Sequence, residues 1–170
     1  DFKEYREPFV GGGSVAVYLT KKYPNLDIWV NDLYEPLVNF WKTLQDDGKN
    51  LHTELQELKS KHPEPVTAKN LFLESKEVLN DNKASHLSRA VAFYIVNKCS
   101  FSGLTESSSF SKQASNSNFS MRGIDKIPAY SKLIENWKIT NKRYQELFTD
   151  DRSVFTYLDP PYEIGSNLYG

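Results

Sequence analysis

Two hydrophobic patterns alternate along the first part of the chain. Short apolar runs at 5–9 and 26–30 predict buried strands, and the first of them stops at three consecutive glycines. Residues 14–24 between them read as a helix with Ser14 at its N-cap. The second strand is followed at once by Asp32. A doubly wound α/β sheet begins with this order of elements: a strand, a glycine turn, a helix, a second strand and an acidic residue.

The rest of the chain has mostly helical spacing and one final strand. The segment 85–99 has little polar surface in its middle, so we expect it to cross the core. A final apolar run at 153–158 predicts a strand that ends in two prolines, which cannot continue a sheet ladder. Apolar periodicity predicts the other helices at 35–48, 51–62, 68–80 and 128–138, with a short one at 141–148 capped by Asn141.

One segment lacks both the strand-like and the helical pattern. Residues 100–120 contain nine serines in 21 positions and show almost no periodicity. By composition alone the stretch is typical of a flexible linker. Three phenylalanines within it argue against a pure spacer, so both interpretations stand at this point.

Composition and charge narrow the class of protein. At 39% hydrophobic and 25% charged residues, with a net charge of −1, the 170 residues are those of an ordinary soluble domain. Between residues 98 and 145 there are eight Lys/Arg against three Asp/Glu (8 − 3 = 5), a local positive surplus suited to phosphate. The single cysteine and scattered histidines predict neither a disulfide nor a metal site. No apolar run is long enough for a membrane span or a signal peptide, so we expect a cytoplasmic protein.

The glycine turn at 11–13 is the first candidate for chemistry. Glycines after a strand bring backbone N–H groups close to a ligand, although a lone Gly-Gly-Gly is more often a plain turn. Neither the dinucleotide fingerprint nor a P-loop lysine follows. Asp32 lies where an acid can accept both hydroxyls of a ribose, or it caps the next helix. A ribose ligand without pyrophosphate fits this pattern, and S-adenosylmethionine is one.

Asp159-Pro160-Pro161-Tyr162 is the second candidate. At the carboxyl end of a strand its side chains face the ligand crevice. The carboxylate of Asp159 and the carbonyl of Pro160 are two acceptors, matched to the two hydrogens of a primary amine. Tyr162 offers a flat face on which an aromatic base can stack. A plain turn is the alternative, but a turn does not need this combination.

With these motifs the chain resembles the Dam-like, D12 class of DNA adenine-N6 methyltransferases. The resemblance rests on the ordered set Glu7–Val15, Asn31-Asp32, Asn97–Leu104 and Asp159–Tyr162. It implies a Rossmann-like, S-adenosylmethionine-dependent methyltransferase sheet with an inserted helical and hairpin target-recognition region. Further parts of the fold are expected outside these residues. The implied catalytic, cofactor-binding domain is 1–50 with 137–170, and the DNA-binding region is 51–136.

The resemblance also implies roles for single residues. Asp159, Pro160 and Tyr162 would be catalytic, because they would hold and stack the extruded adenine. Many relatives carry an acid before the aromatic residue near the adenine of the cofactor, where this chain has Arg143 before Tyr144. The implied cofactor-binding residues are Phe9, Gly11, Gly12, Gly13, Asp32, Arg143, Tyr144 and Asp159.

The DNA contacts implied by the resemblance lie in the serine-rich stretch. There Phe101 would wedge into the base stack of a DNA-contacting hairpin. A solvated loop in the absence of DNA remains the alternative. Ser102 and Glu106 replace the Asn and Arg that the best-known Dam enzymes carry around Gly-Leu, so recognition of GATC does not follow. The implied DNA-binding residues are Phe101, Ser102, Lys112, Asn118 and Arg122.

The expected function is therefore transfer of a methyl group from S-adenosylmethionine to N6 of a flipped adenine in double-stranded DNA, without a metal. Cytosine-N4 methyltransferases usually carry Ser where Asp159 stands, and RNA or protein-glutamine methyltransferases usually carry Asn. Either chemistry on the same fold, or a catalytically silent DNA-binding module, is the alternative. A cognate restriction endonuclease acting on the same site is the expected partner in a restriction–modification setting.

Overall fold

The chain divides into two compact units. The computed structural model describes residues 2–100 and 108–160. The sheet unit is Asp1–Leu33 together with Trp137–Gly170, and the helical unit is Tyr34–Asn136. The sequence-based division changed unit after residue 50, whereas the compact units change at residue 33, ahead of a long helix.

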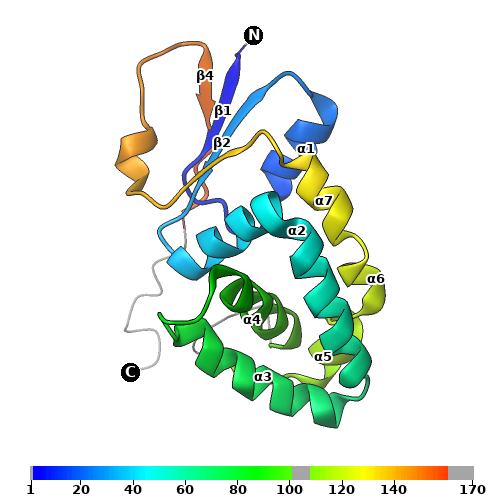
Figure 1. Ribbon diagram of the computed structural model, residues 1–170. Coiled ribbons are helices and arrows are strands. Elements are labelled where there is room, and N and C mark those ends of the chain that lie inside the picture. The colour runs from blue at the N-terminus through cyan, green and yellow to red at the C-terminus, as the bar shows by residue number, and fades with distance from the viewer. Residues whose placement is uncertain (1, 101–107, 161–170) are drawn as a thin grey trace. The chain divides into compact units, whose positions relative to one another are not determined.

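The described part of the sheet unit contains a four-stranded parallel sheet in the order β3-β2-β1-β4. Figure 1 shows β4, β1 and β2 next to one another. The chain moves outward from β1 through β2 to β3, then returns to the other side of β1 with β4. This reversal is the topological switch of a doubly wound sheet, which confirms the predicted α/β class. Ligands of such folds bind at the carboxyl ends of the strands beside the switch. The strands are β1 (Glu4–Glu7), β2 (Asp27–Asn31), β3 (Lys138–Thr140) and β4 (Val154–Thr156).

Helix α1 (Ser14–Lys22) connects β1 to β2 and begins directly after the glycine turn. Gly11 and Gly13 have φ values of 47° and 65°, a left-handed conformation that glycine adopts without steric cost. Gly13 is the N-cap residue, and the N–H of Val17 donates to its carbonyl at 2.9 Å. The prediction of Ser14 as N-cap is therefore wrong by one residue, because the left-handed glycine already makes the turn into the helix.

The helical unit is built around α4, which packs against both α2 and α3. Every residue from Ala90 to Val96 is buried, so the expectation that this segment crosses a core is confirmed. Ser85 caps the helix by accepting a hydrogen bond from the N–H of Ser88 at 3.0 Å. The helices of the unit are α2 (Glu35–Lys61), α3 (Pro65–Asn80), α4 (His86–Cys99), α5 (Lys112–Asn118), α6 (Met121–Ile124) and α7 (Ile127–Leu133).

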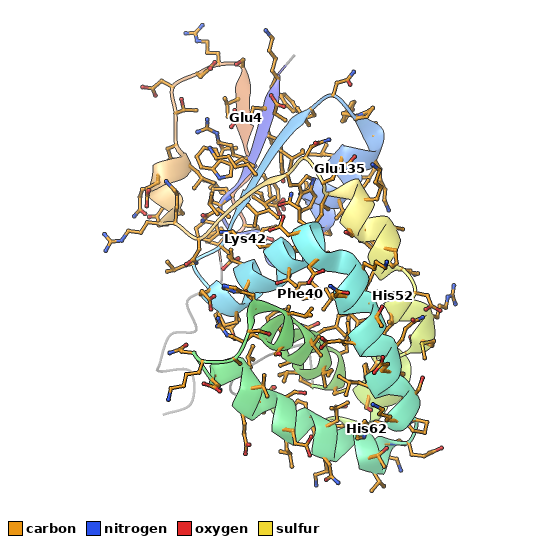
Figure 2. The ribbon with its side chains drawn as sticks, viewed as in Figure 1. Glu4, Phe40, Lys42, His52, His62 and Glu135 are labelled. Atoms are coloured by element: carbon orange, nitrogen blue, oxygen red, sulfur yellow. The ribbon has the colours of Figure 1, made fainter. Side chains whose placement is uncertain are left out.

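Helix α2 contains both helices predicted at 35–48 and 51–62, joined end to end across a kink. It continues through the Asp-Asp-Gly sequence with one kink, at Asp47 (φ −138°, ψ 35°). Phe40, His52 and His62 mark its course from one side of the kink to its end in Figure 2. Next to the kink, a Cβ on Gly48 would collide with the side chain of Ser131 in α7. Glycine is thus needed at position 48 for the close approach of α7, and the break that the Asp-Asp-Gly sequence favoured is present as the kink at Asp47.

The segment before the last strand was predicted less well. Helix α7 ends at Leu133, and the residues from Lys138 form β3 rather than the end of a helix. β3 was not predicted because its three residues directly follow a stretch with helical spacing, whereas the equally short β4 lies inside a longer apolar run that ends at two prolines. The short helix expected at 141–148 is a 3-10 helix, η2 (Tyr144–Leu147), capped by Arg143 rather than Asn141.

The described part of the serine-rich stretch is ordered into helices, so the linker interpretation is wrong for residues 108–120. Ser111 accepts a hydrogen bond from the N–H of Ala114 at 3.1 Å and caps α5, and Ser120 caps α6. The expected hairpin falls largely on 101–107, outside the described residues. An antiparallel bridge joins Ser100 to Phe110 on its two sides. Within residues 2–100 and 108–160, no helix is long and apolar enough to cross a membrane.

Candidate functional site

The glycine turn lies at the carboxyl end of β1, the central strand beside the switch. The N–H of Val10 donates to the carbonyl of Asn31 at 2.9 Å, and the N–H of Gly13 donates to that of Val10 at 2.7 Å. A Cβ added at Gly11 or Gly12 would have no atom within 4 Å. The backbone therefore requires glycine at positions 11 and 13, while position 12 is exposed and has room for a side chain.

Asp32 lies against this turn from the end of the neighbouring strand. Its Oδ2 accepts a hydrogen bond from the N–H of Gly11 at 3.2 Å, and the residue is half-buried. The following helix begins at Glu35 with Tyr34 as its N-cap, so Asp32 is not its capping residue. Two of the residues predicted for a ribose-containing ligand are thus in direct contact.

Three aromatic rings form a row near the same edge. The ring of Phe9 lies 5.3 Å from that of Tyr144, which meets Phe148 edge-on at 5.7 Å between centroids. Tyr144 and Phe148 remain 41% and 49% exposed, and such rings can take a further aromatic group. Phe148 was not singled out from the sequence, although it is the last residue of the short helix predicted at 141–148. Arg143 is exposed, and its backbone N–H donates to Glu146 Oε1 at 3.3 Å.

Glu7 is a buried acid at the end of β1 that sequence reasoning did not assign to the site. It is 4% exposed. Its carboxylate accepts a hydrogen bond from the hydroxyl of Tyr5 at 2.9 Å and another from the N–H of Ala16 in the first turn of α1. Burial raises the pKa of Glu7 to about 7, and the negative charge of Asp159 adds to the increase, while these two hydrogen bonds oppose it. The signal in the sequence was an acid inside the apolar run of a predicted buried strand.

Asp159 and Pro160 follow β4, on the other side of the switch from β2. Both residues are exposed. Asp159 lies close enough to the end of β1 for its charge to act on Glu7. The strand contact continues to Tyr157, whose N–H donates to the carbonyl of Arg6 at 2.8 Å. Tyr162, the third predicted catalytic residue, lies outside the described residues.

The helical unit holds the described part of the predicted DNA-binding set. All three side chains concerned are exposed: Lys112 begins α5, Asn118 ends it, and Arg122 lies in α6. Phe101 and Ser102 lie outside the described residues. Among the residues that the structure does describe, no group of three or more His, Cys, Asp or Glu side chains could hold a metal ion.

The comparisons with known proteins agree with one another, because each match is to a methyltransferase. The family model described as D12 class N6 adenine-specific DNA methyltransferase matches residues 1–169. The chain is 27% identical to "Type II methyltransferase M.MjaIII" of Methanocaldococcus jannaschii over 176 aligned residues, covering 96% of this chain and 60% of that protein. It is 36% identical over 104 residues to "DNA N-6-adenine-methyltransferase" of Escherichia phage P1, covering 61% of this chain and 13% of that protein. It therefore spans less than two thirds of either relative.

Proposed function

Because the chain belongs to the D12 class N6 adenine-specific DNA methyltransferase family, we propose that its protein transfers a methyl group from S-adenosylmethionine to N6 of adenine in double-stranded DNA. One observation carries this proposal. The N–H of Gly11 binds the carboxylate of Asp32 at the switch of a parallel sheet, where α/β folds bind nucleosides.

The residues at this edge fit S-adenosylmethionine. Asp32 would accept the hydroxyls of its ribose, and the rings of Phe9 and Tyr144 would take its adenine. Gly11, Gly12 and Gly13 would let the ligand approach the backbone, and Arg143 would lie at the adenine end of the pocket. When bound, this cofactor supplies an electrophilic methyl group on a positively charged sulfur.

The acidic side chains near the glycine turn favour S-adenosylmethionine over a dinucleotide as the ligand. A helix N-terminus that follows a glycine turn commonly binds pyrophosphate through its free N–H groups. In this chain the carboxylate of Glu7 accepts the hydrogen bond of Ala16 at that position. A phosphate brought there would meet a buried acid and the nearby charge of Asp159. A cationic ligand without phosphate would instead be attracted.

The chemical step would rest on Asp159 and Pro160. The carboxylate of Asp159 and the carbonyl of Pro160 would each accept one hydrogen of the adenine amine, while Tyr162 would stack on the flipped base. S-adenosylmethionine would supply the methyl group, and the new N6–carbon bond would replace its carbon–sulfur bond. Asp159 and Pro160 would stabilise the positive charge on the nitrogen until the nitrogen loses a proton.

The helical unit would supply the DNA contacts. Exposed Lys112 and Arg122 would meet phosphates, and Asn118 would meet phosphates or base edges. Phe101 and Ser102 would complete this surface. A DNA substrate is consistent with a location in the cytoplasm. The name of the relative from Methanocaldococcus jannaschii, a Type II methyltransferase, supports extending the proposal to a restriction–modification setting with a cognate endonuclease.

The test is to incubate the intact protein with double-stranded DNA and methyl-labelled S-adenosylmethionine and to digest the DNA to nucleosides. We expect the label in N6-methyladenine. Label in N4-methylcytosine, or a preference for RNA, would replace this activity with an alternative of the same fold. Tight binding of both ligands without transfer would identify a catalytically silent DNA-binding module.

A further inference from the structure

Asn31, the last residue of β2, has a fully buried side chain with every polar atom bonded. Its Nδ2 donates to the carbonyl of Pro8 at 3.1 Å and to that of Lys142 at 2.9 Å. Its Oδ1 accepts from the Oγ1 of Thr140 at 2.8 Å and from the N–H of Lys142 at 2.8 Å. Two donors and two acceptor positions are the full capacity of a carboxamide, so nothing is left for a ligand.

The backbone partners of this amide belong to the loops after β1 and β3. Pro8 directly precedes Phe9, and Lys142 directly precedes Arg143. Asn31 itself directly precedes Asp32. One buried side chain therefore ties together three adjacent strand ends, and the next residue on each is one proposed to bind the cofactor.

We propose that Asn31 is a positioning residue for the cofactor, which sets the spacing between the glycine-turn loop, Asp32 and the loop that carries Tyr144. The inference rests on the proposed function, since it concerns the same ligand. It adds a residue that touches no substrate and acts only through the three loops. A ligand that spans these loops gains affinity when they are already held at its width.

The chemistry of the amide explains why asparagine suits this position. An aspartate of the same shape would lose both donors and set a negative charge against the carbonyls of Pro8 and Lys142. A leucine would leave four backbone and hydroxyl groups without this partner. Thr140 fixes the orientation of the amide, because its hydroxyl accepts from Trp29 Nε1 at 2.8 Å and so donates to the oxygen of Asn31.

The helical unit offers a matched control. Asn39 in α2 is also buried, at 5% exposure. Its Nδ2 donates to the carbonyl of His86 at 3.0 Å, and its Oδ1 lies 2.6 Å from His86 Nδ1. Asn39→Asp disturbs a buried amide of the same type, but one that joins two helices rather than the proposed cofactor loops. Loss of stability alone would affect both variants.

The experiment is calorimetric titration of the intact wild-type protein, Asn31→Asp and Asn39→Asp with S-adenosylmethionine, at a temperature where all three are folded. We expect the dissociation constant to rise about tenfold or more for Asn31→Asp and to stay within about twofold for Asn39→Asp. Wild-type affinity in Asn31→Asp would overturn the inference while leaving the proposed function intact. Absence of binding by the wild type would overturn the proposed function itself.

A second pair of variants keeps the test decisive if Asn31→Asp does not fold. Thr140→Val removes one of the hydrogen bonds that orient the amide, whereas Thr140→Ser keeps the hydroxyl. We expect a roughly threefold to tenfold loss of cofactor affinity in Thr140→Val and near wild-type affinity in Thr140→Ser. Equal affinity in the two variants would contradict the positioning role.

Discussion

The two units bury polar side chains in different kinds of place. In the helical unit, buried Asn39 joins α2 to His86 at the start of α4. In the sheet unit, Glu7 and Asn31 lie at the carboxyl ends of strands, bonded to the first turn of α1 and to the following loops. Buried polar side chains thus join helices in the helical unit and hold the loops of the proposed site in the sheet unit.

This difference predicts which substitutions change the stability of the helical unit and which change the properties of the proposed site. Substitutions at the helix contacts should change the stability of the helical unit and leave cofactor affinity alone. Substitutions at the strand ends should change cofactor affinity, the rate of methyl transfer or the pH dependence of the sheet unit. Four predictions test this division, beginning with the largest expected effect.

Asp159→Ala should lower the rate of methyl transfer about a thousandfold, because the variant loses an acceptor that stabilises charge on the reacting nitrogen. Asp159 is exposed, so the melting temperature should hardly change. The measurement is single-turnover transfer to DNA with saturating cofactor. Asp150→Ala, which removes another exposed acid of the sheet unit, is the control. Equal rates in the two variants would remove Asp159 from the mechanism.

Glu7 should make the stability of the sheet unit depend on pH. Its carboxyl ordinarily titrates near 4.5 and titrates at about 7 in the folded protein, because burial disfavours the charged form. Between these values the folded state binds a proton that the unfolded state has released, so stability falls as pH rises from about 5 to 7. The full loss is on the order of 3 kcal/mol.

Glu7→Gln removes this titration and should flatten the decline, as chemical denaturation at several pH values would reveal. The side chain of Gln still has an acceptor for the N–H of Ala16, so the variant should fold. An unchanged slope between pH 5 and 7 in Glu7→Gln would show that another group is responsible.

Gly48→Ala should destabilise the helical unit by about 1–3 kcal/mol. The new methyl group would collide with the side chain of Ser131 and push α7 away from α2. Cofactor affinity should remain that of the wild type. Gly48→Ala combined with Ser131→Gly relieves the collision and should recover part of the loss. A Gly48→Ala protein as stable as the wild type would contradict the close packing at the kink.

Gly12→Ala should have the opposite effects to Gly48→Ala: it should lower cofactor affinity and leave stability unchanged or slightly higher. Position 12 has no positive φ and no atom within 4 Å of an added Cβ, so the fold should tolerate alanine or gain a few tenths of a kcal/mol. The methyl group would occupy space proposed for the cofactor, and affinity should fall several-fold in a titration. Lower stability with unchanged affinity would refute this assignment of the turn.

Much of the sheet unit could be predicted from the sequence, because its first strands and α1 have clear periodicity and are bounded by glycine and acidic residues. The contact between Gly11 and Asp32 was foreseeable, since both follow neighbouring parallel strands. β3 was missed because its three residues follow directly on a helical pattern at 128–138 and add too little alternation to mark a separate strand. Asn31 and Glu7 lie in the motifs that carry the family resemblance, but their structural roles could not be predicted. These roles depend on partners from distant parts of the sequence, such as Lys142 and Asp159.

The central claim is that the carboxyl edge of the sheet unit binds S-adenosylmethionine. Hydrogen–deuterium exchange of the intact protein, with and without saturating cofactor, tests it most directly. We predict slower exchange in peptides that cover 9–13, 32–33 and 142–148, with unchanged exchange through α3 and α4 of the helical unit. Protection confined to the helical unit, or absent from the glycine turn, would contradict the account.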